Sequence, residues 1–341
     1  MLVTICFIHQ LPQVLVLADS YRQQSPAANS ETPPIVIGLA DDPANLPAGF
    51  QSPYPLLPVS TLFEADYLQK LSAQYTPVEF AAACKPRFIQ AVFTQYPTAQ
   101  TVLYADPNGL FLHSVQPILD RLLDQTVLLT PHMLYPPGDT GPGKSAWPDE
   151  KYLQNIGLYS ADFLAFARSS ETDRLLSWWQ DRVEERAYID FCQGLCTDQL
   201  WLMHVPVFFD KVTIVHNPGW HVALWNLPRR QLRQSGTDWQ LTDTGEPVLF
   251  ANMKGLFNPD EGFFPHQTRL KLADRPDVQA LLNTYRQRVS DTGLSALRSV
   301  SPAYGHQPIP AVLRGWRRAA TGALTAVNRW VDNLDLPALP R

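Results

Sequence analysis

VLYADPNGLFL, residues 102–112, is the stretch that decides the fold of this chain. It begins with an apolar run of β-favouring residues, which is the composition of a buried strand at the centre of a sheet. The run stops at Asp106-Pro107-Asn108-Gly109, where proline fixes φ, glycine relaxes it, and two oxygen-bearing side chains flank the break. The carboxyl end of a parallel strand faces the crevice where open α/β sheets bind ligands. The segment therefore predicts either a site for Mg²⁺ or Mn²⁺ with a diphosphate, or an Asx-capped turn after a core strand.

Predicted strands and helices alternate on both sides of this segment. The expected strands cover residues 2–8, 35–39, 126–130, 158–167, 212–215 and 248–250, and the expected helices cover 12–24, 62–72, 77–95, 115–123 and 171–186. Pro86 is expected to kink or split the helix over 77–95. The alternation predicts a Rossmann-like α/β fold with a doubly wound sheet. Asp42, which follows the second strand, is a candidate for binding a ribose hydroxyl or a base edge, or for capping a turn before Pro43.

The composition is that of a globular protein. Hydrophobic residues make up 45% and charged residues 17% of the 341 residues, which excludes a disordered chain. The net charge of −5, with no long basic run in the main body, argues against a nucleic-acid partner. The four cysteines are scattered and form neither a disulfide framework nor a zinc pattern. The amino terminus lacks the features of a signal peptide and no apolar run reaches the ~18 residues of a membrane span, so a cytoplasmic location is expected.

A second motif, GDTGPGKS at residues 138–145, matches the P-loop pattern in full. A P-loop needs a strand directly before it and a helix directly after it, so that backbone amides and the helix dipole face the phosphates. Here Pro136-Pro137 precede the first glycine and Trp147-Pro148 interrupt a helix begun at Lys144. We therefore interpret the segment as a Gly/Pro-rich loop over a nearby site and not as an ATP site.

Short segments that occur in one order along residues 1–270 identify a family. They are VTIC, YTPVEFAAACKP, VLYADPN, LLTPH, SWW, TDQLW, NPGWHVALWNL, FANMKG and HQTRL. In this order they resemble a bacterial family of GT-A-type nucleotide-diphospho-sugar transferases that is distantly related to glycogenin-like enzymes. The resemblance implies a GT-A glycosyltransferase domain over residues 1–270, with a mixed sheet, and a C-terminal helical extension over 271–341.

The resemblance also implies roles for individual residues. Asp106 falls on the first acidic position of the DxD motif, a ligand of the metal and the sugar diphosphate, and Lys85 falls on a basic position ahead of it. Asp198 and Gln199 match the pair expected to face the transferred sugar and the acceptor. Gly255 matches the glycine of an HFSG-like motif whose histidine ligates the metal in related enzymes.

Several positions depart from the family pattern. Asn108 stands where the second DxD carboxylate is expected, Asn252 where the HFSG histidine is expected, and His221 where an asparagine is expected. The family's N-x-G appears as Ser160-Ala161-Asp162 in the register set by the SWW helix. These changes predict weakened binding of a divalent metal, because hard cations bind neutral oxygens less strongly than carboxylates.

The departures suggest one compensation. A diphosphate leaving group develops negative charge as the glycosidic bond breaks, and a positive group must meet it. Lys254 either supplies part of that charge or lies on a loop without a role in the site. The candidate donor-binding residues are thus Thr4, Asp42, Lys85, Asp106, Asn108, Lys254 and Gly255, and the candidate metal ligands are Asp106, Asn108 and Asn252.

These observations predict a hexosyltransferase-like enzyme that moves a sugar from a nucleotide-diphosphate donor, with a UDP-sugar preferred, to an unidentified acceptor. The expected cofactor is Mn²⁺ or Mg²⁺, bound weakly or dispensable. The glycogenin-like resemblance favours retention of anomeric configuration; if the reaction inverts, Asp198 or Asp162 is the candidate base. The catalytic candidates are therefore Asp198, Gln199 and Asp162. The alternative function is a non-catalytic protein that binds nucleotide sugars or glycans on a degenerate GT-A scaffold.

The chain changes character after Pro310. Apolar residues recur at helical spacing over residues 311–330, together with four arginines and no acidic residue. Such a basic amphipathic helix suits peripheral contact with an anionic membrane. The alternative is a helix that packs on the catalytic domain or on the second subunit of a homodimer.

Overall fold

The computed structural model describes residues 1–25, 35–136, 148–236, 238–259 and 270–306, together with residues 320, 322–324, 326–327 and 330. The P-loop-like segment 138–145, most of the HQTRL segment and most of the predicted tail helix over 311–330 lie outside the described residues. Among the helices of the described part, none is long and apolar enough to cross a bilayer.

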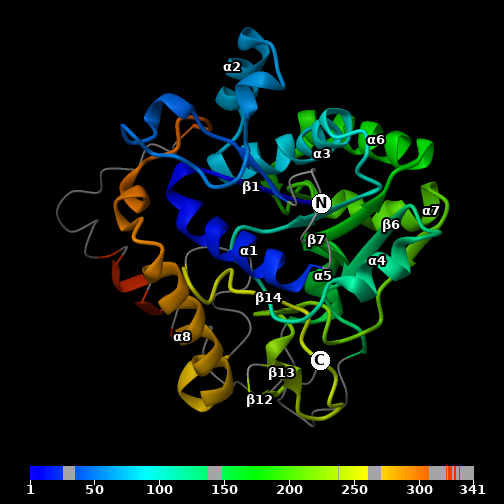
Figure 1. Cartoon of the computed structure of the whole chain (residues 1–341), viewed down its shortest axis with the longest axis vertical. Helices are drawn as coiled ribbons and strands as arrows, with labels where there is room; N and C mark the ends of the chain where they lie inside the picture. Colours follow the sequence, from blue (N-terminus) through cyan, green and yellow to red (C-terminus); the bar gives the residue numbers. More distant parts are fainter. Residues whose placement is uncertain are drawn as a thin grey trace.

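A seven-stranded mixed sheet forms the centre of the molecule (Figure 1). Its strands, in spatial order, are β10 (Val212–Ile214), β6 (Val127–Pro131), β7 (Tyr159–Ala167), β4 (Thr101–Ala105), β1 (Leu2–Cys6), β2 (Ile35–Leu39) and β3 (Leu56–Pro58). Strand β7 runs antiparallel to both of its neighbours, and the other pairs of adjacent strands are parallel. The α/β class and the doubly wound sheet predicted from the sequence are confirmed.

Helices cover both faces of this sheet. The α-helices of the described residues are α1 (Leu11–Gln24), α2 (Ala65–Gln74), α3 (Pro77–Gln95), α4 (Gln116–Leu122), α5 (Glu150–Ile156), α6 (Ser170–Arg186), α7 (Val205–Phe208) and α8 (Pro276–Asp291), of which α5 and α8 pack outside the two faces. Side chains alternate along a strand, so Val3 of β1 faces the core beneath α3 and α6, whereas Leu2 faces the core beneath α1 and α4. Figure 1 shows α3 and α6 together on one side of the sheet.

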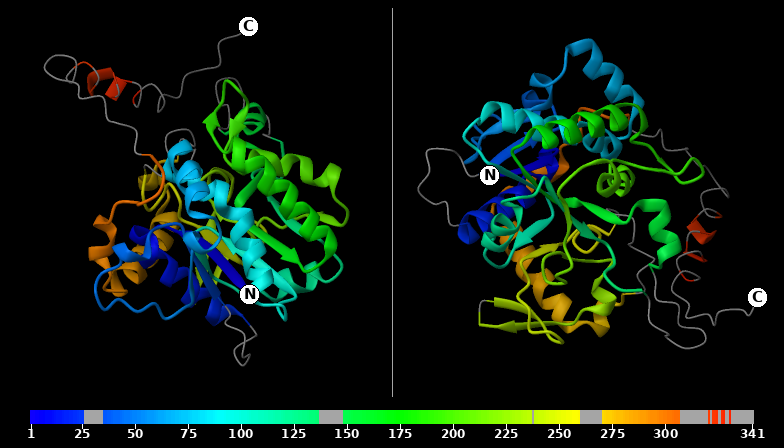
Figure 2. Two further views of the ribbon diagram at one scale, coloured as in Figure 1. Left: turned by 90° about the horizontal axis from the view of Figure 1, so that it is seen from above. Right: turned by 90° about the vertical axis from the view of Figure 1, so that its right-hand side faces the viewer.

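A third core lies beside the sheet. It contains β5 (Gly109–Phe111), β14 (Phe250–Asn252) and β11 (Val222–Ala223), which form a small sheet in the order β11-β14-β5, and the hairpin of β12 (Leu232–Ser235) and β13 (Asp238–Leu241). Helix α8 packs into this core, beside the hairpin (Figure 2). The first part of the predicted C-terminal extension therefore shares a core with residues from the first 270. A further two-stranded ribbon joins β8 (Ile189–Asp190) to β9 (Leu195–Cys196).

Two local predictions were wrong. Pro86 does not split the helix over 77–95, because α3 packs on the sheet and beside α6, and this packing outweighs the lost hydrogen bond. The last strand is β14, Phe250–Asn252, and not residues 248–250. Its register is set by pairing with β5, which aligns Asn252 with Gly109.

Candidate active site

The turn after β4 holds Asp106 in a defined orientation. One carboxylate oxygen, Oδ1, accepts hydrogen bonds from the backbone N–H of Asn108 at 2.9 Å and from its side-chain Nδ2 at 3.1 Å. This is an Asx turn, as one of the two interpretations of the sequence predicted. The other oxygen, Oδ2, lies 3.3 Å from Lys254 Nζ, and Asp106 lines the cleft.

The small sheet brings Lys254 to this turn. Strand β5 starts directly after Asn108 and pairs antiparallel with β14, and Met253 N–H donates to the Asn108 carbonyl at 2.9 Å. The Asn252 side chain accepts a hydrogen bond from Lys254 N–H at 2.9 Å, and Gly255, with φ of 75°, turns the chain away. Lys254 is therefore placed by strand pairing and two turns.

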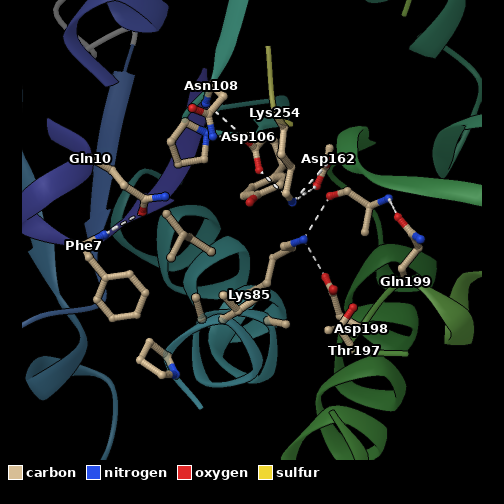
Figure 3. A pocket seen from close by; sticks show the side chains of 18 of the residues that line it. Phe7, Gln10, Lys85, Asp106, Asn108, Asp162, Thr197, Asp198, Gln199 and Lys254 are labelled. Carbon is tan, nitrogen blue, oxygen red and sulfur yellow. Dashed lines mark hydrogen bonds and ion pairs between the residues drawn. The ribbon is translucent and has the colours of Figure 1, made fainter. Parts of the chain in front are cut away.

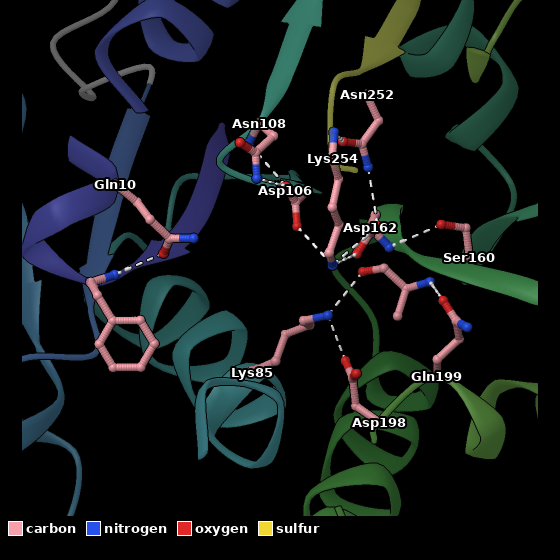
Figure 4. Close-up of polar contacts among 12 residues, drawn as sticks. Gln10, Lys85, Asp106, Asn108, Ser160, Asp162, Asp198, Gln199, Asn252 and Lys254 are labelled. Atoms are coloured by element: carbon pink, nitrogen blue, oxygen red, sulfur yellow. Dashed lines mark hydrogen bonds and ion pairs between the residues drawn. The ribbon is translucent and has the colours of Figure 1, made fainter. Parts of the chain in front are cut away.

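The ammonium group of Lys254 lies between two carboxylates (Figure 4). Its Nζ is 3.3 Å from Asp106 Oδ2 and 3.1 Å from Asp162 Oδ1. Asp162 comes from β7, the antiparallel strand next to β4, and its carbonyl accepts from Asp106 N–H at 2.8 Å. The Asn252 Nδ2 group donates to Asp162 Oδ2 at 3.1 Å. Three chain segments thus converge on one charged cluster.

A second buried ion pair lies across the cleft. Lys85 of α3 pairs with Asp198, and its Nζ also donates to the Ala161 carbonyl at 3.0 Å. Asp198 follows Thr197, whose φ of 50° is unusual for a β-branched residue, and the Asp198 carbonyl accepts from Trp179 Nε1 at 3.0 Å. Backbone strain of this kind is found where the surroundings over-determine a functional geometry.

Burial and mutual charge shift the pKa values of this cluster. Burial raises the pKa of Asp106, and Lys254 only partly offsets that effect. Burial alone would also raise the pKa of Asp162, but Lys254 and Lys85 outweigh it, so this pKa is lowered. For Lys254, burial would lower the pKa, but the two carboxylates outweigh burial and raise it above its usual range. Lys254 therefore stays protonated at neutral pH.

The cleft around these groups measures about 450 Å³ (Figure 3). It extends from Phe7 and Gln10, which follow β1, past the Lys254 cluster to Asp198 and Gln199. Both β1 and β4 end here, as expected for a ligand crevice of an open α/β sheet. The volume suits a ligand of the size of a nucleotide or a drug.

Seven of the residues predicted for the site line this cleft. They are Lys85, Asp106, Asn108, Asp162, Asp198, Gln199 and Lys254. Their roles remain predictions. The Gln199 amide is engaged with backbone, accepting from Ala161 N–H at 3.3 Å and donating to the Ile156 carbonyl at 2.7 Å, so it joins β7 to the end of α5.

Four predicted residues do not line the cleft. Thr4 is fully buried within β1, and Asp42 caps a short turn by accepting from Ala44 N–H at 2.9 Å. Asn252 lies behind Asp162, and Gly255 follows Lys254 in the turn.

Sequence reasoning did not single out several lining residues. Phe7 and Gln10 follow β1, and the rule that drew attention to the end of β4 applies equally to the end of this strand. Tyr104 lies 4.5 Å beneath the Lys85 ammonium, and no local signal separates it from an ordinary core tyrosine. Ile189 and Val78 form an apolar part of the wall.

The arrangement does not fit a divalent metal at the three predicted ligands. Oδ2 of Asp106 faces an ammonium group, and Asn252 accepts from backbone through its oxygen and presents its N–H to Asp162. Across the described residues, no three His, Cys, Asp or Glu side chains are grouped as a metal site would require.

Comparison with known proteins gives remote similarities. No family model matches the chain. The uncharacterized protein YfnF of Bacillus subtilis (strain 168) is 27% identical over 201 residues, which are 59% of this chain and 64% of that protein, so the match spans less than two thirds of its length. Among solved structures, the galactosyltransferase LgtC in complex with donor and acceptor sugar analogues aligns with 89% of this chain and 97% of its own, at 14% identity and a TM-score of 0.45. A glycosyltransferase involved in glycosylation of the major capsid of PBCV-1 aligns with 74% of this chain and 93% of its own, at 8% identity and a TM-score of 0.39.

Proposed function

We propose that this chain is a GT-A-type glycosyltransferase that moves a sugar from a nucleotide-diphosphate donor to a hydroxyl group of an acceptor. The observation that carries the proposal is the cleft at the carboxyl ends of β1 and β4, in which Asp106, Asp162 and Lys254 form one buried cluster. A doubly wound sheet with polar groups at this edge is suited to a nucleotide ligand.

The cleft offers three zones for such a donor. The nucleoside would lie toward Phe7 and Gln10, where a ring and an amide are available for stacking and hydrogen bonding. The diphosphate would lie at the Lys254 ammonium, and the sugar between Asp162 and Asp198. The preferred donor is a UDP-sugar, as in the sequence prediction.

Glycosyl transfer requires a positive charge near the leaving diphosphate and a base for the proton of the acceptor hydroxyl. The bond between the anomeric carbon and the diphosphate oxygen breaks with its electron pair on the oxygen, so a fixed positive charge nearby lowers the barrier. The acceptor hydroxyl forms the new bond to the anomeric carbon and loses its proton to a base. If configuration is retained, the departing diphosphate oxygen can take that proton. If the reaction inverts, Asp198 is the candidate base, because its carboxylate lines the cleft opposite the Lys254 cluster.

The test is a panel of UDP-, GDP- and TDP-sugars with chromatographic detection of released nucleoside diphosphate and of glycosylated products. We expect turnover with at least one donor. The site variant Asp198→Asn should be at least ~100-fold slower, whereas Asp181→Asn, on an exposed part of α6, should match the wild type. Proton NMR of the product anomer then checks the expected retention of configuration. Tight binding of a nucleotide sugar without any release would favour the non-catalytic alternative.

A further inference from the structure

Lys254 occupies the centre of the charged cluster. Its Nζ is 3.3 Å from one carboxylate and 3.1 Å from the other, and its side chain is only 22% exposed. If Lys254 lay on a loop without a role in the site, its side chain would extend into solvent, since a long charged side chain is rarely buried unless it is paired. Ion pairing with the two carboxylates therefore holds Lys254 inside the cleft.

The neighbouring amides favour an ammonium group over a metal ion in this place. Asn252 directs its N–H toward Asp162, and Asn108 directs its N–H toward Asp106, so both amides donate hydrogen bonds to carboxylate oxygens. A metal would need those oxygens as ligands and would need amide oxygens, not amide nitrogens, turned toward it.

The charges of the cluster are balanced only in part by Lys254. Asp106 and Asp162 carry two negative charges and Lys254 carries one positive charge, so the three side chains together have a net charge of −1. The ammonium group therefore offsets one of the two carboxylates before any ligand binds.

We propose that the Lys254 ammonium is the resident cation of this cleft, held between Asp106 and Asp162, and that it meets the diphosphate of the donor in place of a divalent metal. The proposal rests on the proposed function for its catalytic consequence, but the identity of the resident cation is testable without turnover. Lys254 would act as a binding and charge-stabilising residue with the phosphate oxygens as its targets.

The first experiment measures Mn²⁺ binding by electron paramagnetic resonance, with the full chain and no donor. The wild type and Lys70→Ala, a change on an exposed part of α2, should bind Mn²⁺ only weakly. Lys254→Ala leaves Asp106 and Asp162 without their cation and should bind Mn²⁺ at least ~10-fold more tightly. The double variant Asp106→Asn/Lys254→Ala should lose that gain. Tight Mn²⁺ binding by the wild type, or no gain in Lys254→Ala, would overturn the proposal.

The second experiment measures turnover with the donor found in the panel. Wild-type turnover should persist in excess EDTA, whereas Lys254→Met, which keeps the apolar stem, should fall ~100-fold or more. Lys254→Arg should retain part of the activity, and added Mn²⁺ should restore part of it to Lys254→Ala. Loss of wild-type turnover in EDTA with recovery on adding Mn²⁺ would show that a metal, and not Lys254, is the cation.

The two proposals fail in different ways. If no donor turns over in any variant, the proposed function is wrong, and the Mn²⁺ measurements still decide which cation the carboxylates hold. Thermal unfolding of every variant shows that Lys254→Met and Lys254→Ala are folded before either result is interpreted.

Discussion

Asp106 serves a local and a long-range interaction at the same time. One oxygen closes the Asx turn with Asn108, and the other faces Lys254, which lies 148 residues further along the chain. The first interaction orients the carboxylate, and the second pairs it with a cation in the cleft.

We expect Asp106→Ala to lower glycosyl transfer by ~100-fold or more, because the Lys254 ammonium loses one of its two anchors in the cleft. Steady-state kinetics with the active donor measure the loss, and circular dichroism confirms that the variant is folded. A folded Asp106→Ala protein with near-normal turnover would remove Asp106 from the site.

Two buried histidines make stability depend on pH. Burial lowers the pKa of His221 to about 3 and that of His132 to about 4, against 6.5 for an exposed imidazole. Between pH 6.5 and about 4 the unfolded chain therefore binds protons that the folded chain does not, so the free energy of unfolding falls as the pH falls. Each histidine contributes a slope of at most ~1.4 kcal/mol per pH unit in this window.

Replacing His221 should reduce that slope. Urea unfolding of His221→Phe between pH 7.5 and 4.5 should show a weaker loss of stability on acidification than the wild type, whereas the exposed His216→Phe should show the wild-type slope. Identical slopes for His221→Phe and the wild type would show that His221 is not the group that titrates.

At the scale of elements, the pairing of β5 with β14 positions the cation. Gly109 begins β5 beneath the Phe250 ring, which is fully buried and stacks on Phe163 at 4.7 Å between ring centres. A methyl group at position 109 would overlap that ring and lie 3.0 Å from the Asp106 carbonyl oxygen. The close approach of the two strands requires glycine here.

Gly109→Ala should therefore destabilise the protein by about 1–3 kcal/mol and also lower turnover, because β14 leads directly into Lys254. Urea unfolding and kinetics measure the two effects. The double variant Gly109→Ala/Phe250→Leu, which removes the overlapping ring, should be less impaired than expected from the sum of the single changes. Unchanged stability of Gly109→Ala would contradict the packing described.

At the scale of the whole molecule, residues 270–306 are part of the fold. Leu281, Leu282 and Tyr285 of α8 are buried in the third core. Further along, Ala303 N–H donates to Asp41 at 2.8 Å and His306 N–H donates to the Tyr75 carbonyl at 2.8 Å. Residues 303–306 thus contact the segments that follow β2 and precede α3.

A chain cut after residue 270 should be insoluble or should unfold at a markedly lower temperature than a chain cut after residue 306. The shorter chain loses α8 and exposes the apolar side chains that α8 covers. Differential scanning calorimetry of both chains is the measurement. A well-folded chain of 270 residues would instead support a domain boundary at that position.

Residues 311–330 are predicted from sequence to contact an anionic membrane. The full chain should co-sediment with phosphatidylserine-containing vesicles at low salt, and a chain cut after Pro310 should stay in the supernatant. Neutral phosphatidylcholine vesicles are the control for the arginine contribution. If neither chain sediments, the segment packs on protein, and dimer formation is then measured by sedimentation velocity.

Local sequence was sufficient for six of the seven strands of the central sheet and for the turn at Asp106, but not for the short edge strand β3. Hydrophobic runs, proline and glycine act over a few neighbouring residues, so β2 and α3 occur where the pattern predicted them. The same local signals could not place the last strand, because pairing with β5 and not the apolar run over 248–250 sets its register.

The long-range partners of the charged candidate residues were decided by tertiary structure alone. Lys254 contacts Asp106 and Asp162 because β14 pairs with β5 and β7 lies next to β4. Neither pairing can be predicted from the residues around Lys254. The sequence by itself determined which charged and amide side chains exist and which strand ends they follow. Lys254 stands between carboxylates that lie 92 and 148 residues away in the sequence, and only the folded chain brings these residues together.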